Sequence, residues 1–282
     1  MKYLFSRRSL VGLGLVALLS GRAHGQPVFR LGLTPVFLDN DAAVIDGLRR
    51  ALSRGMGRDI ELVQRRTYQE ITGLLLDRSV DAAWLCGYPY LQHADVLDLV
   101  AVPVWRGGPR YQSYLIVGPE DGAEALSDLR GGTHAFSDPD SNSGYLVTAT
   151  DLRRMGEQVE SFFSRSIFTF GHRNVVRAVA DGLVRSGSVD GYVWEALAVI
   201  EPDLTARTQV IARSEWLGFP PVCARGDSLN SEPVEALQSA LMGLHATEEG
   251  RQALASLQLD GFQPAAAGLF DGIAERMSDL DP

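Results

Sequence analysis

The stretch SDPDSNSGYLV, which occupies residues 137–147, is the most informative part of this sequence. A short β-rich run at 133–136 precedes it, and a helical pattern at 145–155 follows it at once. Turn-forming residues between two such patterns indicate a strand that passes directly into a helix. We therefore expect residues 141–144 in the first turn of that helix.

This expected first turn consists of Ser141, Asn142, Ser143 and Gly144. Backbone N–H groups in a first turn have no intrahelical partner, and the helix dipole is positive there. Two hydroxyls, one amide and a glycine that permits close approach would form a neutral cradle for a small oxyanion. An ordinary Ser/Asn N-cap is the alternative interpretation, and this stretch alone does not exclude it.

The N-terminal segment predicts export. Residues 1–8 carry three basic side chains, residues 10–20 form an apolar run, and small residues surround a possible cleavage site near Gly25-Gln26. The apolar run is too short to span a bilayer, so a cleaved signal peptide at 1–25 and a periplasmic protein are expected. The paired arginines also fit a twin-arginine signal, and both export routes stay open.

The charge of the chain excludes several classes of function. Without residues 1–25 it keeps 22 basic and 35 acidic residues, a formal charge of −13. Such an acidic surface argues against nucleic acid or an anionic membrane as a partner. Lys2 is the only lysine, so the mature protein has none for a Schiff base or a P-loop. An anion would have to be captured by a local site.

Cysteine and histidine residues give no sign of a metal or a disulfide framework. Cys86 and Cys223 are the only cysteines. They could pair in an oxidising compartment or remain two buried thiols. His93, His134 and His245 have no metal-like spacing, so we expect neither a metal nor a cofactor.

Strand and helix patterns alternate along the rest of the chain. Two successive sets of β-α-β units predict an α/β protein of two lobes, each a mainly parallel sheet flanked by helices, with a hinge between them. We expect one lobe to comprise residues 26–117 plus 211–282 and the other residues 118–210. Ligand loops of such sheets lie at the carboxyl ends of the strands. Polar and aromatic residues gather at four expected strand ends, a pattern typical of a hinged binding protein with its site between the lobes.

Taken in order, the motifs resemble those of periplasmic substrate-binding proteins of phosphate, phosphite and phosphonate ABC transporters. These proteins have the two-lobed class II binding-protein fold, and the resemblance covers essentially the whole mature chain. It rests on TYQE at 67–70, VDAA at 80–83, GYPY at 87–90, YQS at 111–113, the stretch 137–147, GH at 171–172 and VDG at 189–191.

The resemblance implies that Ser141, Asn142 and Ser143 hold the phosphorus oxygens, although the family commonly has threonine where Asn142 stands. It also implies that an aromatic residue after the third strand closes over the ligand. Tyr88 and Tyr90 are the two candidates for that role.

Further ligand contacts are expected from both lobes. The resemblance implies a histidine contact from His172 and an acidic residue, for which Asp190 and Glu195 are candidates. Tyr111 or Gln112 would add a donor.

Two other residues near the expected strand ends are also candidates. Tyr192 is retained as a ligand contact because of its position, although core packing is the common role of such a tyrosine. Cys86 departs from the family pattern. With this residue the chain most resembles a branch of the family that is similar to exported arsenite-binding proteins. A thiolate is a soft ligand suited to arsenic(III), while the alternative is a small buried side chain.

The sequence thus predicts an exported, monomeric solute-binding protein, not an enzyme, that captures a small oxyanion for an ABC permease. The alternative is an arsenite receptor that uses Cys86 and docks on a sensor histidine kinase. A secreted hydrolase is a remote alternative, because Ser143-Gly144 lacks the Gly-x-Ser-x-Gly elbow of such enzymes.

Overall fold

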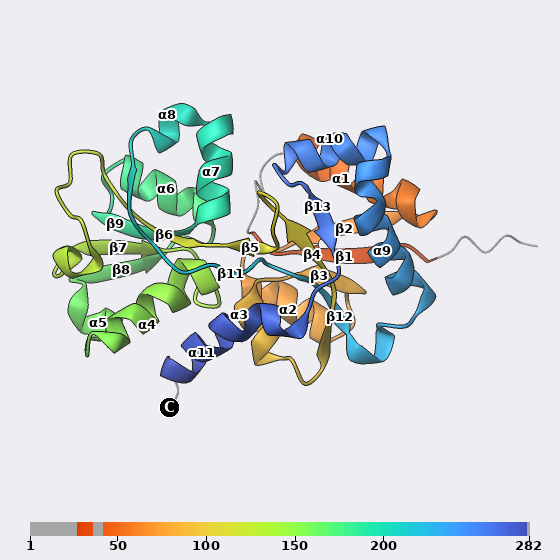
Figure 1. The fold of residues 1–282 in the computed structure, drawn as a ribbon, viewed down its shortest axis with the longest axis horizontal. Coiled ribbons are helices and arrows are strands. Elements are labelled where there is room, and N and C mark those ends of the chain that lie inside the picture. The colour runs from red at the N-terminus through yellow and green to blue at the C-terminus, as the bar shows by residue number, and fades with distance from the viewer. Residues whose placement is uncertain (1–26, 36–41, 281–282) are drawn as a thin grey trace, which may run out of the picture.

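The computed structural model describes residues 27–35 and 42–280, which form two lobes joined side by side (Figure 1). The expected signal peptide at 1–25 lies outside the described residues. Within the described residues, we find no helix with the length and apolar character that a membrane span requires.

The first lobe contains a six-stranded mixed sheet in the order β13-β4-β12-β3-β1-β2. Its strands are β1 (Phe29–Leu33), β2 (Ile60–Gln64), β3 (Ala82–Trp84), β4 (Leu97–Val104), β12 (Val222–Arg225) and β13 (Gly261–Gln263). β1 pairs in parallel with β2 and β3, whereas β12 and β13 pair antiparallel with their neighbours. The helices are α1 (Ala42–Met56), α2 (Tyr68–Leu76), α3 (Gly87–Gln92), α9 (Glu232–Gly243) and α10 (Glu248–Ser256).

The second lobe contains a five-stranded mixed sheet in the order β10-β6-β9-β7-β8. Its strands are β6 (Ser113–Val117), β7 (Thr133–Phe136), β8 (Arg165–Phe168), β9 (Ser186–Asp190) and β10 (Gln209–Arg213). Its helices are the 3-10 helix η1 (Leu126–Leu129), the π-helical turn η2 (Asn142–Leu146), α4 (Val147–Arg154), α5 (Val159–Phe162), α6 (His172–Ala180), α7 (Gly191–Ile200) and α8 (Pro202–Thr205).

Two short antiparallel strands, β5 (Arg110–Tyr111) and β11 (Leu217–Gly218), connect the lobes (Figure 1). The two-lobed α/β fold expected from the sequence is confirmed, but the sheets are mixed rather than mainly parallel. β6 and β10 belong to the second sheet. We therefore propose lobe boundaries at the β5 and β11 crossings rather than at 117/118 and 210/211.

A further helix, α11 (Asp271–Leu280), follows the 3-10 helix η5 (Ala267–Phe270) and runs along the edge of the molecule near the C-terminus (Figure 1). It contacts α3 of the first lobe and α4 of the second. The C-terminal helix therefore joins the lobes at a place separate from the paired crossing strands.

Local sequence signals account for the helix starts that position the site. Thr67 caps α2 through a complete capping box with Glu70. Ser141 accepts a hydrogen bond from the Gly144 N–H and so caps η2. Asp190 accepts hydrogen bonds from the backbone N–H groups of the first turn of α7. β9 therefore ends at Asp190, because this carboxylate caps the helix that begins at Gly191.

Candidate ligand-binding site between the lobes

A buried polar cluster lies where helix starts of the two lobes meet. Tyr68 and Cys86 come from the first lobe, at the starts of α2 and α3, and Asn142 and His172 come from the second. The Tyr68 hydroxyl lies 3.1 Å from His172 Nε2, and the Asn142 N–H donates to Cys86 Sγ at 3.3 Å. All four residues are buried. Both contacts cross from one lobe to the other.

The turn η2 is held in a fixed shape around its backbone N–H groups. The Gly144 N–H donates to Ser141 Oγ at 3.0 Å, and the Ser113 hydroxyl donates to the Ser143 carbonyl at 2.6 Å. A Cβ atom on Gly144 would lie 1.8 Å from Ser137 Oγ, so no other residue fits there. The turn is thus built with close backbone packing, as a helix N-terminus that receives an anion requires.

His172 fixes the hydrogen-bonding role of Tyr68. The Asp190 N–H donates to His172 Nδ1 at 3.0 Å, so Nδ1 carries no proton. Burial lowers the pKa of His172 to about 3, which keeps the ring neutral with its proton on Nε2. Nε2 must then donate to the Tyr68 hydroxyl, whose own proton remains available for another acceptor.

Like Tyr68, Tyr111 is a tyrosine whose hydroxyl accepts a hydrogen bond at the cluster. The Asn142 side-chain N–H donates to its hydroxyl at 2.8 Å, and the residue is fully buried. The Ser143 side chain also hydrogen-bonds this phenol. Asn142 Oδ1 and Ser137 Oγ are buried without a hydrogen-bond partner among the described residues. Since buried polar groups are normally satisfied, these atoms mark unused hydrogen-bonding capacity beside the turn.

Two carboxyl groups accompany these donors. Asp138 Oδ2 accepts from the Tyr68 N–H at 3.2 Å, which adds a further bond between the lobes. Asp190 is fully buried, and burial raises its pKa to about 7 despite the N–H groups of Val193 and Tyr192 that favour its charged form. Burial also raises the pKa of Cys86 to about 12, so this residue is a neutral thiol. The cluster offers hydroxyl, amide, imidazole, thiol and carboxyl groups. The residues named for it include no lysine or arginine, so an anion would be bound there by hydrogen bonds from neutral donors.

The structure brings most of the expected site residues together. Those at the cluster are Cys86, Tyr111, Ser141, Asn142, Ser143, Gly144, His172 and Asp190. Tyr88 is partly buried at the start of α3, next to Cys86, where its backbone N–H faces the sulfur.

Tyr90 and Gln112, two of the residues expected to contact the ligand, interact with other parts of the protein. Tyr90 packs on Phe270 with ring centroids 5.2 Å apart, which is away from the cluster. The Gln112 side chain donates to the Ser214 carbonyl and so ties the two crossing segments together. Each side chain therefore has a partner within the protein, and its contact with a ligand stays a prediction.

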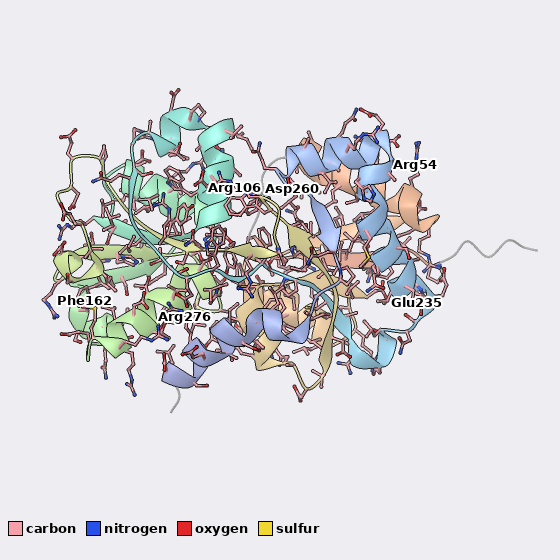
Figure 2. All side chains as sticks on the ribbon, viewed as in Figure 1. Arg54, Arg106, Phe162, Glu235, Asp260 and Arg276 are labelled. Atoms are coloured by element: carbon pink, nitrogen blue, oxygen red, sulfur yellow. The ribbon has the colours of Figure 1, made fainter. Side chains whose placement is uncertain are left out.

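Tyr192 and Glu195, two residues of the second lobe that were also expected to contact the ligand, lie outside the cluster. The Tyr192 hydroxyl donates to the Leu257 carbonyl of the first lobe. Glu195 pairs with Arg106 at 2.9 Å and accepts from the Tyr114 hydroxyl. Arg106 lies close to Asp260 of the first lobe, above Arg276 in the view of Figure 2. Both residues therefore contribute contacts between the lobes, and Asp190 alone of the two acidic candidates lies at the cluster.

Two residues of the cluster were not predicted as site residues. Tyr68 belongs to the TYQE motif and Asp138 to the stretch 137–147, but neither motif by itself predicts that these side chains lie at the site. The capping box at Thr67 was the available signal, because it places Tyr68 at a helix start directly after a strand, as for Ser141. No group of three metal-binding side chains is found among the described residues.

Two α/β lobes with a two-stranded connection and a buried polar cluster between them define a solute-binding protein of the class II periplasmic type. The chain matches the family model described as "ABC transporter, phosphonate, periplasmic substrate-binding protein" over residues 31–269, and it belongs to that family. It is thus a periplasmic-type substrate-binding protein of the phosphonate ABC transporter family.

Solved structures show the same fold. The chain is similar to a binding protein component of an ABC phosphonate transporter from Pseudomonas aeruginosa, at 23% identity and a TM-score of 0.82, covering 89% of this chain and 86% of that one. A protein from Prochlorococcus marinus in complex with methylphosphonate matches at 18% identity and a TM-score of 0.78, covering 90% and 98%. A Xanthomonas citri protein, solved bound to chloride, matches at 17% identity and a TM-score of 0.71, covering 90% and 97%.

Proposed function

We propose that the protein binds a small phosphonate, or a closely related phosphorus oxyanion, at the cluster between the lobes and delivers it to an ABC permease. The observation that carries this proposal is the start of η2, whose buried N-terminal turn lies beside the hydroxyl groups of Tyr68 in the first lobe and of Tyr111 on the crossing strand β5. Family membership supports the class of ligand and of partner. We further propose that export uses the signal peptide at 1–25, cleaved near Gly25-Gln26.

In this proposal the ligand oxygens take up the free hydrogen-bonding capacity of the cluster. Tyr68 and Tyr111 would donate their phenol protons, and the Asn142 and Ser143 groups of the turn would bind the remaining oxygens. The Asn142 N–H, held by the Cys86 sulfur in this structure, would exchange that weak acceptor for a ligand oxygen. The lobes would move relative to each other at the crossing strands as the ligand enters.

The ionisation of the cluster favours a protonated ligand. Asp190 has a pKa of about 7 and lies among the neutral donors. When ionised, its carboxylate accepts a hydrogen bond from a protonated ligand oxygen but repels a fully ionised phosphonate. We therefore propose that the monoanion binds better than the dianion.

The arsenite alternative gains no support from these observations. A thiol with a pKa of about 12 is a poor source of thiolate, and Cys223 lies on β12 as a separate buried free thiol. The comparisons likewise point to phosphonate transport rather than to a sensor kinase. The hydrolase alternative is also unsupported, since the family is one of solute-binding proteins.

The test is isothermal titration of the mature protein with methylphosphonate, phosphite and phosphate. We expect binding of at least one of them, and we expect Ser143→Ala and Tyr68→Phe to weaken it. Tyr90→Phe serves as the control, because it keeps the packing on Phe270 and lies outside the cluster. No binding by the native protein, or equal affinity in Ser143→Ala, would contradict the proposed site.

A further inference from the structure

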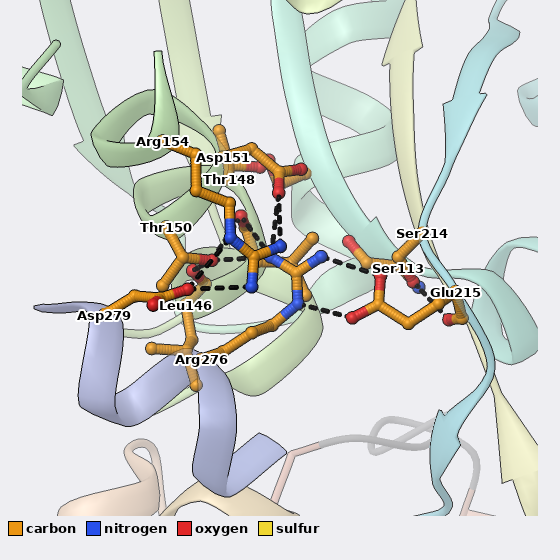
Figure 3. Close-up of polar contacts among 12 residues, drawn as sticks. Ser113, Leu146, Thr148, Thr150, Asp151, Arg154, Ser214, Glu215, Arg276 and Asp279 are labelled. Carbon is orange, nitrogen blue, oxygen red and sulfur yellow. Dashed lines mark hydrogen bonds and ion pairs between the residues drawn. The ribbon is translucent and has the colours of Figure 1, made fainter. Parts of the chain in front are cut away.

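Arg276 of α11 is a buried charge that connects three parts of the molecule. Its side chain is only 3% exposed. The guanidinium forms a two-pronged pair with Glu215, with Nε and Nη2 each 2.7 Å from a carboxylate oxygen. It also donates to Asp151 Oδ1 at 2.8 Å and to the Val147 carbonyl at 3.1 Å (Figure 3).

These partners lie next to the anion-binding turn. Val147 is the first residue of α4 and directly follows η2, so Arg276 holds the helix that continues the turn. Glu215 lies between β10 and β11, on the segment that returns to the first lobe. Beside it, Ser214 Oγ accepts from the Ser113 N–H, and the Ser113 hydroxyl donates to the Ser143 carbonyl. The crossing segments and Arg276 thus fix the turn from two sides.

The other end of α11 reaches the first-lobe side of the site. A Cβ on Gly87 would lie 2.6 Å from Ile273 and 3.1 Å from Phe270. Gly87 is the first residue of α3, directly after Cys86. The helix therefore contacts both the segment that carries Cys86 and the helix that carries the turn.

The Arg276 guanidinium is buried, whereas the side chains of its partners Glu215 and Asp151 are 49% and 39% exposed. Burial opposes ionisation, but Glu215 and Asp151 keep the pKa of Arg276 above its ordinary value. Removal of the Arg276 side chain would leave these two carboxylates in contact with water and would take one donor from the Val147 carbonyl, so the main loss is the fixed geometry rather than an unpaired buried charge. A second α11–α4 pair, Arg154 with Asp279, has the same 2.7 Å spacing but is 44% and 35% exposed, so it should contribute little.

We propose that Arg276 is a positioning residue for ligand binding: it fixes the anion-binding turn η2 relative to the crossing segment without touching the ligand. The ligand part of this inference rests on the proposed function, whereas the positioning of the turn does not.

The experiment compares Arg276→Met with the matched control Arg154→Met by two measurements on the mature protein. Hydrogen exchange without ligand reports the rigidity of the turn, and titration with methylphosphonate reports affinity. In Arg276→Met we expect faster exchange at 141–151, unchanged exchange in β3 and α9, and binding weaker by about tenfold or more, because small displacements of binding groups are costly. Arg154→Met should resemble the native protein in both measurements.

Unchanged exchange at 141–151 in a folded Arg276→Met protein overturns the inference, as does an equal change in Arg154→Met. If Arg276→Met does not fold, Glu215→Gln replaces it, because this variant weakens one anchor of Arg276 and leaves Asp151 in place. Glu215→Gln must then show the local increase in exchange, and its absence overturns the inference. If the native protein binds none of methylphosphonate, phosphite and phosphate, the proposed function fails while the exchange measurement still decides the positioning role.

Discussion

The substitution Gly144→Ala tests whether the turn η2 has the close packing that the structure shows. The added methyl would lie 1.8 Å from Ser137 Oγ, 2.7 Å from Ser137 Cβ and 3.0 Å from Ser141 Oγ. Rotation of the Ser137 hydroxyl relieves the first contact but not the second. The two backbones are also tied, because the Ser137 N–H donates to the Gly144 carbonyl at 3.2 Å.

The expected cost follows from these contacts. Forcing a methyl group into a packed interior costs about 1–3 kcal/mol. Separating the two segments also weakens one backbone hydrogen bond, with a net contribution of about 1 kcal/mol. We therefore expect Gly144→Ala to lower the free energy of unfolding by roughly 2–4 kcal/mol, measured by urea denaturation. Ligand affinity should fall with it, because the turn must shift.

A second substitution makes the reasoning falsifiable. Ser137→Gly removes both clashing atoms, so the double variant Ser137→Gly/Gly144→Ala should regain most of the lost stability. Gly73→Ala is the control, because this helical glycine has no atom within 4 Å of an added Cβ and should gain slightly in stability. A Gly144→Ala protein as stable as the native one, or one that Ser137→Gly does not rescue, would refute the packing argument.

Three further outcomes are expected. Burial raises the pKa of Asp190 to about 7, so the native state keeps a proton that the unfolded state loses near pH 4, and the contribution of this residue to stability should fall by about 4 kcal/mol between pH 4 and 7. The measurement is the difference in urea stability between the native protein and Asp190→Asn, which should change by that amount across this range; a difference that stays constant would contradict it. Burial lowers the pKa of His134 to about 3, so its contribution has the opposite sign: the unfolded state takes up a proton below pH 6.5, and this contribution is lost as the pH falls. His134→Gln should reduce that acid-side loss, measured by thermal unfolding against pH, while His172, whose pKa is also lowered to about 3, keeps its own share. Arg106→Ala breaks an exposed pair with Glu195 and should change stability by less than about 1 kcal/mol; a larger loss in urea would mean that this pair controls contact between the lobes.

Local patterns predicted the parts of the site that depend on helix starts. The serines, amide and glycine of residues 141–144 lie where the strand–turn–helix pattern placed them, and the TYQE sequence at 67–70 forms the capping box that its Thr and Glu spacing encodes. Such signals involve neighbours within four residues, so they survive in any tertiary context.

The side-chain partners that the sequence did not predict are those that depend on a distant segment or on the rotation of a helix. Tyr88 and Tyr90 are two residues apart on α3 and point to different sides of it, and Phe270, far along the chain, determines which tyrosine packs inward. Tyr192 and Glu195 were expected at a strand end, but capping by Asp190 begins α7 and turns them toward other partners.

The antiparallel pairing of the late strands could not be read from the sequence either. β12 is four residues long, and nothing in its pattern shows that it inserts between β3 and β4. Strand partners separated by more than a hundred residues are selected by the assembled core rather than by local preference.

That insertion has a consequence for the order in which the molecule can fold. A chain that has emerged as far as Arg213 already contains every strand of the five-stranded sheet. The six-stranded sheet is still interrupted at its centre, because β3 and β4 meet only through β12 and the outer strand β13 comes later still. The N-terminal lobe must therefore wait for the C-terminal residues, so the middle of the chain can become native first and the two ends complete the molecule together.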